Sequence, residues 1–354
     1  MVVAIYSGPD CNTFIILTCN STQSDLLSSS SNTTNKLPNL LFLDDANHEL
    51  VRKTNILIAS VQCLLPQEKE SWRDLNHVIF VTHVLPPHWF KSEFDYVKNR
   101  NLKISIVYLC EWTRQYVEAN APYLVATENI ETLNKYVIGN PLMSDVLPDL
   151  RANTNHIVRD PHAFVFLSTW ERGGDIALSA FRRIRQIYPD AVFHVASYNP
   201  NYPTVCENDG VIVHKSLGKV ALSELLLRCG TFIYPLCLPN GHIHKDTFAC
   251  CVSEAIALGV NVITYRQGAL AELYAECVDF VQLPENILNT MTNFNFHAFE
   301  SWLTTDEAIN DIVVRVVSLL SKNDDAERIR RSDIVRAKYL DAEIGRLWND
   351  LMIS

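Results

Sequence analysis

The stretch KDTFACCVSEAIALG, residues Lys245–Gly259, is the most informative part of this chain for its fold. It predicts a helix over Phe248–Leu258, with Thr247 as the N-cap residue and Gly259 as the stop. Apolar residues occupy both faces of the predicted helix, which indicates burial between a sheet and other helices. Such a position is typical of a helix in an α/β protein.

Two carboxylates flank the start of this helix, Asp246 just before it and Glu254 in its second turn. A carboxylate on an otherwise apolar helix is costly unless something hydrogen-bonds it. The backbone N–H groups of Thr247, Phe248 and Ala249 form a site suited to phosphate. Together these groups fit a ligand that carries both hydroxyls and phosphates. The alternative for Glu254 is a structural pairing with a buried arginine.

The composition is that of a compact protein with room for two domains. The chain has 354 residues, 48% of them hydrophobic and 20% charged, and its net charge of −10 argues against a nucleic-acid partner. Its apolar runs fall short of a membrane span, so there is no strong membrane signal. The 10 cysteines form no Cys-x-x-Cys pair, and we expect them to be reduced in a cytoplasmic protein.

Short apolar runs alternate with helical patterns in both halves of the chain. In the first half we expect strands at Val2–Tyr6, Phe14–Thr18, Leu40–Leu43, Ile56–Ser60, Val78–Thr82 and Ile104–Leu109. In the second half we expect them at Ala163–Leu167, Ala191–Ala196, Val211–His214, Thr231–Tyr234, Val260–Thr264 and Phe280–Leu283. The alternation predicts an α/β fold of two Rossmann-like domains, whose parallel sheets face one cleft. We place them at residues 1–157 and 158–338, with the C-terminal helix 339–354 packing back on the first.

A nicotinamide dehydrogenase would share this pattern, but it should carry a Gly-x-Gly-x-x-Gly run after a strand. The chain has only 11 glycines and no such run, and it has no Walker phosphate loop either. The sequence therefore favours folds that hold a nucleotide without either motif.

Three segments of the second half carry a family resemblance. They read FVFLSTWERGGDIALSAFRRI from Phe164, VIVHKSLGKVALSELLLRCGTFIYP from Val211, and KDTFACCVSEAIALGVNVITYRQGALAE from Lys245. In this order and spacing they resemble the donor-binding domain of retaining GT-B glycosyltransferases of family 4. The chain further looks like a virus-encoded member of that family, such as those of the chloroviruses.

The family motif is Glu-x7-Glu before a helix of small residues, and here it reads Asp246-x7-Glu254. The first acid is therefore one methylene shorter than in the family. The resemblance implies that Asp246 touches hydroxyls of the transferred sugar and that Glu254 holds the ribose. A glycosidase with two catalytic carboxylates is the competing interpretation, but it needs the acids on opposite sides of one bond.

Basic residues are expected to neutralise the diphosphate. Arg172 lies in a turn between a strand and a helix, where the family grips the diphosphate with a basic residue, and a solvated turn charge is the alternative. A second family arginine is missing near Ser168, which we still count among the donor-binding residues. Lys245 or Lys219 is expected to replace it, and Lys245 is nearer the motif.

The remaining candidates follow other strands. The resemblance places His214, Lys215 and Leu217 under the nucleobase, largely through backbone contacts. It places His83 near the sugar and the acceptor, and Gly8 against the phosphates. A lone histidine is more often structural, which is the alternative for His83.

The resemblance implies a retaining transfer of a hexose from a nucleotide diphosphate sugar to a glycan or glycoprotein. GDP-mannose is the first choice of donor and UDP-glucose the second. We expect no protein nucleophile, no metal and no other cofactor; the histidines His242 and His244 lack further ligands at metal spacing. Two alternatives remain, a nucleotide-sugar epimerase of the same fold and a catalytically inactive binder. A homodimer is also left open.

Overall fold

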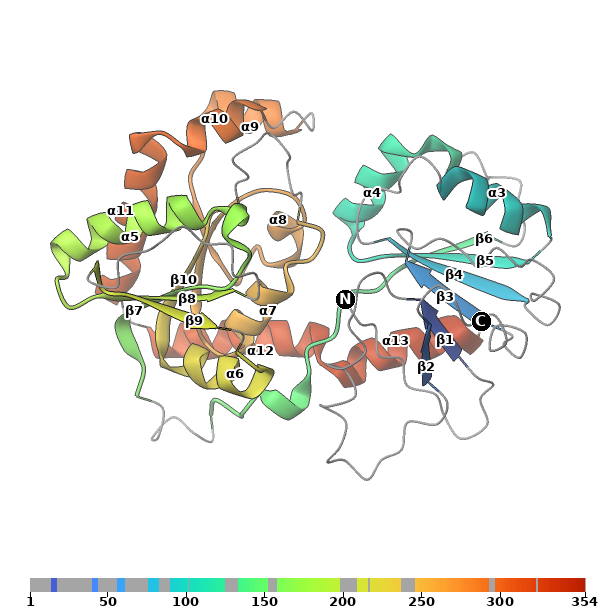
Figure 1. Cartoon of the computed structure of the whole chain (residues 1–354), viewed down its shortest axis with the longest axis horizontal. Coiled ribbons are helices and arrows are strands. Elements are labelled where there is room, and N and C mark those ends of the chain that lie inside the picture. The colour runs from blue at the N-terminus through green and yellow to red at the C-terminus, as the bar shows by residue number, and fades with distance from the viewer. Residues whose placement is uncertain are drawn as a thin grey trace. The chain divides into compact units, whose positions relative to one another are not determined.

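The computed structural model describes residues 14–17, 40–43, 56–60, 76–82, 90–100, 102–124, 133–151, 158–197, 209–215, 217–236, 246–292, 297–322 and 324–353. These belong to two compact units, one of residues 1–140 with 342–354 and one of residues 141–341 (Figure 1). The predicted strand Val2–Tyr6 lies outside the described residues, as do the candidates Gly8, His83, His242, His244 and Lys245.

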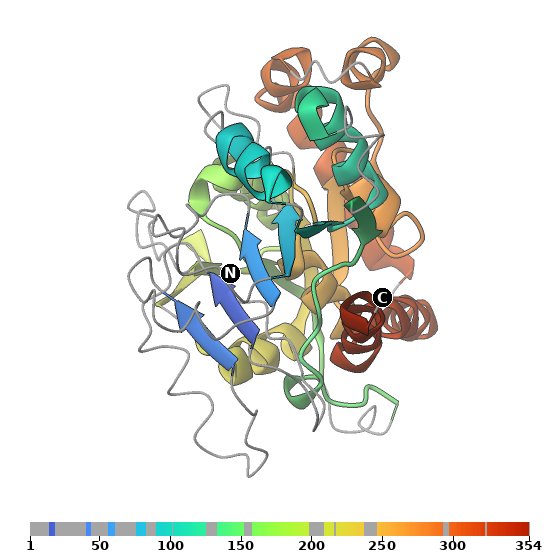
Figure 2. The ribbon, with the colours of Figure 1, turned by 90° about the vertical axis from the view of Figure 1, so that its right-hand side faces the viewer.

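The first unit contains a parallel sheet of six strands in the order β2-β1-β3-β4-β5-β6. The strands are β1 (Phe14–Leu17), β2 (Leu40–Leu43), β3 (Ile56–Ser60), β4 (His77–Thr82), β5 (Lys103–Tyr108) and β6 (Leu133–Val137). Figure 2 shows the blue arrows of β1 to β4 side by side, all pointing the same way. Helices α3 (Phe90–Asn99) and α4 (Glu111–Asn120) and the 3₁₀ turn η2 (Pro122–Leu124) belong to the same unit.

Aromatic residues pack α3 onto the sheet in the core of the first unit. Phe80 of β4 meets Phe90 of α3 edge to face, with ring centroids 4.9 Å apart, and Phe94 packs beside both. All three rings are buried, so α3 is fixed to the sheet by its apolar face. Phe90 and Phe94 are four residues apart and therefore lie on the same face of α3, as in an amphipathic helix.

The second unit contains the other six-stranded parallel sheet, in the order β12-β11-β10-β7-β8-β9. Its strands are β7 (Asp160–Phe166), β8 (Val192–Ser197), β9 (Val211–Lys215), β10 (Cys229–Tyr234), β11 (Asn261–Tyr265) and β12 (Asp279–Val281). Its helices include α5 (Gly174–Ile187), α6 (Lys219–Arg228), α7 (Cys250–Ala257), α8 (Leu270–Leu273), α9 (Glu285–Thr292), α10 (His297–Leu303), α11 (Asp306–Lys322) and α12 (Asp325–Tyr339). The 3₁₀ turns η3 (Ser144–Val146) and η4 (Trp170–Arg172) complete it, and α13 (Asp341–Ile353) follows α12.

The strand order of the second sheet reverses next to β7. The chain runs outward through β8 and β9, then returns to place β10 on the other side of β7. Figure 1 shows α5 and α11 on one face of the sheet, and α6, α7 and α12 on the other. Ligands of open α/β sheets bind beside the carboxyl ends of the strands at such a reversal. The ends of β7 and β10 are therefore the place to look for a site.

Helix α7 is held at its C-terminal end by polar side chains from neighbouring elements. Arg159 donates to the carbonyl of Leu258 at 2.7 Å, and Arg336 of α12 donates to the carbonyl of Ala257 at 2.8 Å. The hydroxyl of Ser332 donates to the same Ala257 carbonyl at 2.7 Å. Positive charges at the C-terminal end of a helix interact favourably with the helix dipole. The same side chains also donate hydrogen bonds to the last carbonyl groups of α7, which fixes the helix in position.

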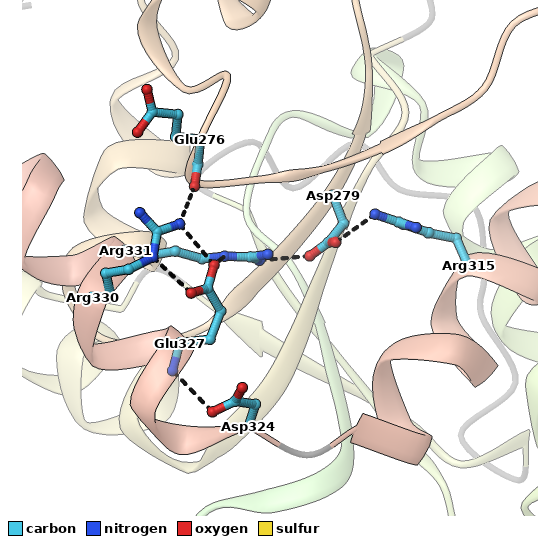
Figure 3. Close-up of polar contacts among 7 residues, drawn as sticks. All are labelled: Glu276, Asp279, Arg315, Asp324, Glu327, Arg330 and Arg331. Atoms are coloured by element: carbon cyan, nitrogen blue, oxygen red, sulfur yellow. Dashed lines mark hydrogen bonds and ion pairs between the residues drawn. The ribbon is translucent and has the colours of Figure 1, made fainter.

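Charged residues join α11 and α12 to the edge of the second sheet (Figure 3). Buried Asp279, at the start of β12, accepts from Arg315 at 2.7 Å and from Arg331 at 2.6 Å. Glu327 accepts from Arg331 at 2.9 Å and from Arg330 at 2.7 Å. The carboxylate of Asp279 is thus shared by two helices, which ties their positions together.

The segment before β7 belongs to the second unit, so the unit boundary falls at 140/141 rather than at 157/158. Hydrogen bonds between this segment and α12 explain the assignment. The amide of Leu142 donates to the carbonyl of Tyr339 at 2.6 Å, and Arg336 donates to the carbonyl of Pro148 at 2.7 Å. At the other end of the chain, residues 342–354 belong to the first unit.

The strands expected within the described residues are all present, with ends displaced by a few residues. One strand, β6, was not predicted, because LNKYV has no apolar run and its residues stay partly or fully exposed. Among the described residues, no helix combines the length and the apolar character that crossing a bilayer requires.

Candidate functional site

The turn that carries Arg172 is built by two glycines and a tryptophan. Arg172 ends η4, and Gly173 follows with a φ of 101°, a conformation that favours glycine. A Cβ atom on Gly174 would lie 2.4 Å from the ring of Trp170, so α5 can begin only with glycine at this position. The indole N–H of Trp170 donates to Asp175 at 3.0 Å. The turn therefore fixes Arg172 just beyond the carboxyl end of β7.

Asp246 is buried, with 8% of its surface exposed, and both of its carboxylate oxygens accept hydrogen bonds. Oδ2 accepts from the hydroxyl of Tyr234 at 2.5 Å. Oδ1 accepts from the amide of Ala249 at 2.7 Å and from that of Phe248 at 3.3 Å. The Asp246 carboxylate thus occupies these two amides, and a phosphate would have to displace it. The predicted phosphate contact of Phe248 and Ala249 stays a prediction.

The start of α7 also differs from the prediction. The helix begins at Cys250, and the residue before it, Ala249, has a φ of 54° in the left-handed region. Thr247 is therefore not the N-cap residue. The cause is the Asp246 carboxylate, whose bonds to the following amides turn the chain before the helix can start. The predicted stop at Gly259 is confirmed by its φ of 75°.

Arg172, Tyr234 and Asp246 form one cluster at the carboxyl ends of β7 and β10. The Nη1 atom of Arg172 lies 3.9 Å from Oδ2 of Asp246, and the guanidinium interacts electrostatically with the Tyr234 hydroxyl. Burial alone would lower the pKa of Arg172, but the nearby Tyr234 and Asp246 raise it overall. Arg172 is thus a fixed cation, and 31% of its side chain remains exposed.

Glu254, in the second turn of α7, pairs with Lys219, the first residue of α6. Its partner is thus a lysine and not the buried arginine of the alternative interpretation. The thiol of Cys251 lies within electrostatic range of the cluster and of Glu254. Its pKa is raised, chiefly by burial, then by Asp246 and Glu254, while Arg172 opposes the shift. The charges of Asp246, Glu254 and Arg172 therefore all act on Cys251, in the first turn of α7.

The turn after β11 contacts the backbone of Asp246. Gly268 has a φ of 51°, and a Cβ atom there would lie 2.8 Å from the Asp246 carbonyl oxygen. The amide of Ala269 donates to that oxygen at 3.0 Å. Gln267 donates to the carbonyl of Pro235, directly after β10, at 3.2 Å. These contacts fix the backbone of Asp246 relative to the end of β10.

The candidates around β9 occupy the carboxyl end of that strand. His214 lies in β9, and its Nε2 atom is 3.0 Å from Nδ1 of His194 in β8. Burial lowers the pKa of both rings, that of His194 to about 4, so both are neutral at pH 7. Lys215 is the last residue of β9, and Leu217 follows shortly before α6. Their predicted contact with a nucleobase stays a prediction.

Sequence reasoning missed Tyr234 and His194. Tyr234 had one available signal, a polar-tipped residue at the carboxyl end of a buried strand, directly before Pro235. Ser168 is buried just beyond the end of β7, near the Arg172 turn. Within the part of the chain that the structure describes, no three His, Cys, Asp or Glu side chains gather as metal ligands.

The sequence matches no protein-family model and no curated protein. Solved structures do match. The Anabaena protein HepE, in complex with UDP and glucose, has a TM-score of 0.63 at 10% identity, with 97% of this chain and 100% of that chain covered. Sucrose-phosphate synthase from Thermosynechococcus elongatus has a TM-score of 0.60 at 10% identity, with 97% and 98% covered.

The pneumococcal O-GlcNAc transferase GtfA, in complex with UDP and GlcNAc, has a TM-score of 0.57 at 12% identity. The match covers 84% of this chain and 56% of GtfA, so the chain spans only about half the length of that protein. At such identities the likeness shows the fold alone. The chain has the GT-B fold, with two α/β units of parallel sheets. These structures give no support to a viral origin.

Proposed function

We propose that this chain is a glycosyltransferase that moves a sugar from a nucleotide diphosphate sugar to a hydroxyl acceptor. The observation that carries the proposal is the meeting of Arg172, Tyr234 and Asp246 at the carboxyl ends of β7 and β10. This is where a doubly wound sheet binds nucleotides. The structural neighbours HepE and GtfA, with bound UDP and sugar, give the proposal its substrate class.

Arg172 is the group that we assign to the diphosphate. Its guanidinium is held by the protein on one side and partly exposed on the other. Negative charge grows on the leaving nucleoside diphosphate as the glycosidic bond breaks. A fixed guanidinium stabilises that charge and can bind two phosphate oxygens at once. Arg172 therefore lowers the barrier in addition to holding the donor.

Glu254 is the group that we assign to the ribose. Its side chain is 24% exposed, so a ligand can reach the carboxylate, and Lys219 balances its charge. Carboxylates accept hydrogen bonds from vicinal hydroxyls, which a ribose provides. We assign Lys219, the partner of Glu254, to phosphate binding in place of the missing second arginine.

The reaction that we propose retains the configuration of the sugar. The departing phosphate helps to deprotonate the acceptor hydroxyl on the same face, and no protein nucleophile is needed. Arg172 and Lys219 supply the charge neutralisation. This part of the proposal rests on the family resemblance of the motif Asp246-x7-Glu254. His83, outside the described residues, stays the candidate nearest the acceptor.

Three nucleotide sugars are candidates for the donor substrate. The resemblance favours GDP-mannose and then UDP-glucose. The neighbours favour UDP, because HepE was also solved in complex with UDP-glucose, and GtfA holds UDP and GlcNAc. UDP-glucose, UDP-GlcNAc and GDP-mannose therefore form the smallest panel that covers both lines of reasoning.

The proposal is tested by incubating the full chain with each donor and a set of glycan acceptors. We expect acceptor-dependent release of UDP or GDP and a glycosylated product. Arg172→Gln should abolish the release, whereas Arg182→Gln, a change of an exposed arginine on α5, should not. Epimerised nucleotide sugar without acceptor would point to an epimerase, and binding without turnover to an inactive binder. A folded protein that binds none of the three donors would overturn the proposal.

A further inference from the structure

The hydroxyl of Tyr234 stands between the two charged groups of the site. Tyr234 is the last residue of β10 and is fully buried. Its hydroxyl donates to Oδ2 of Asp246 at 2.5 Å, and it also interacts electrostatically with the guanidinium of Arg172. Asp246 Oδ2 and Arg172 Nη1 are 3.9 Å apart, which is beyond hydrogen-bond distance. The phenol therefore lies close to an anion and a cation that are not hydrogen-bonded to each other.

The direction of these polar contacts follows from the chemistry of the groups. A guanidinium can only donate, and an ionised carboxylate can only accept. The single proton of the phenol goes to Asp246, so its oxygen offers only lone pairs to the guanidinium of Arg172. Burial and the charge of Asp246 raise the pKa of Tyr234 well above its usual value, so the proton stays on the phenol.

This arrangement has a consequence for Arg172. In a direct, two-point ion pair a carboxylate accepts from two N–H groups of the guanidinium. Here the neutral phenol of Tyr234 and a carboxylate oxygen 3.9 Å away act on the guanidinium, with no such two-point pair. The guanidinium is held in place while its positive charge and its remaining donors can serve an anion. Its side chain is 31% exposed, so an anion can reach it.

We propose that Tyr234 is a positioning residue, which together with Asp246 orients Arg172 toward the pyrophosphate of the donor. The inference rests on the proposed function and adds a residue to it. The inference also makes Asp246 a positioning residue, which agrees with its contacts. Both oxygens of this short, buried side chain accept bonds from the protein, so Asp246 acts through Tyr234 and Arg172. A contact to sugar hydroxyls would have to displace one of these bonds.

The test is a double-mutant cycle on nucleotide affinity, measured calorimetrically with the full chain and with UDP and GDP as probes. The variants are Tyr234→Phe, Arg172→Met and the double variant. Tyr265→Phe is the matched control, since it removes a buried hydroxyl from the neighbouring strand β11 that donates to the Ala308 carbonyl. Thermal melting of each variant reports on folding.

We expect Tyr234→Phe to weaken binding about tenfold, the effect of losing a hydrogen bond to a charged group. In the Arg172→Met background the same change should have no further effect, because Tyr234 acts through Arg172. Tyr265→Phe should bind like the wild type. If Tyr234→Phe does not fold, Asp246→Asn takes its place in the cycle, with the same expectation.

The outcomes separate this inference from the proposed function. A wild-type chain that binds neither UDP nor GDP overturns both. A wild type that binds, with a Tyr234→Phe variant that binds equally well, overturns only the role of Tyr234. An equal loss with and without Arg172 overturns it too, because a general structural effect would be additive.

Discussion

Glu254 and Lys219 form an ion pair that joins the second turn of α7 to the first residue of α6. The two side chains are 24% and 53% exposed, so water reaches both of them. An exposed ion pair contributes at most about 1 kcal/mol to stability. The pair therefore adds little to the stability of the fold, and the ribose contact that we propose for Glu254 can be tested without unfolding the protein.

Glu254→Gln should weaken the binding of UDP and GDP about tenfold, because a neutral amide accepts weaker hydrogen bonds from the ribose hydroxyls. The melting temperature should hardly change. Calorimetric titration measures the affinity, and Glu272→Gln, at an exposed acid of α8, serves as the control. Equal affinity of Glu254→Gln and wild type would remove Glu254 from the site.

Asp246→Ala should remove turnover and also destabilise the protein, by about 3 kcal/mol. It takes away the acceptor of Tyr234 and of two amides, and it leaves these donors buried without partners. The denaturant midpoint of unfolding measures the loss. Asp190→Ala, at an exposed aspartate, should leave the midpoint unchanged. A stable, fully active Asp246→Ala protein would contradict both roles of this carboxylate.

Apolar runs were enough to locate strands such as β10 and β11, because a strand buried on both faces needs little else in its sequence. The edge strand β6 lacks such a run and was missed. Arg172 could be predicted as well, since its two glycines mark a tight turn between a strand and a helix. These features depend on residues close together in the chain.

The contacts of the site depend on residues far apart in the chain, and they could not be predicted. The Tyr234 hydroxyl bonds Asp246, 12 residues later in the chain, and Lys219 of α6 pairs with Glu254 of α7. No spacing in the sequence encodes either contact. The start of α7 was misplaced for a related reason: the Asp246 carboxylate bonds amides that the pattern assigned to the helix.

Asp279→Asn should destabilise the second unit by about 3 kcal/mol, because it removes the carboxylate that Arg315 and Arg331 share and leaves Arg331 with Glu327 alone (Figure 3). Asp209→Asn, which breaks the exposed pair with Arg182, is the matched control and should cost almost nothing. Denaturant unfolding followed by circular dichroism measures both. Similar midpoints for the two variants would show that the shared carboxylate does not hold α11 and α12.

His77, in the first unit, should make stability depend on pH. Its ring is buried at the start of β4, and Nε2 lies 2.8 Å from the hydroxyl of Ser105. Burial, followed by the charge of Lys103, lowers the pKa of His77 from 6.5 to about 4. In the unfolded chain the ring binds a proton below about pH 6.5, while in the folded chain it does so only near pH 4.

The unfolded state therefore binds more protons between these two values, and stability must fall as the pH decreases through this window. Above pH 6.5 the effect is absent, because the ring is neutral in both states. The full loss amounts to about 3 kcal/mol.

His77→Gln keeps a hydrogen-bonding side chain but cannot titrate, so its stability should change less than that of the wild type over this range. His162→Gln, at a histidine whose ring is partly exposed in the second unit, is the control. Equal pH dependence of the wild type and His77→Gln, measured by denaturant unfolding at pH 7, 5.5 and 4, would show that His77 is not the group responsible.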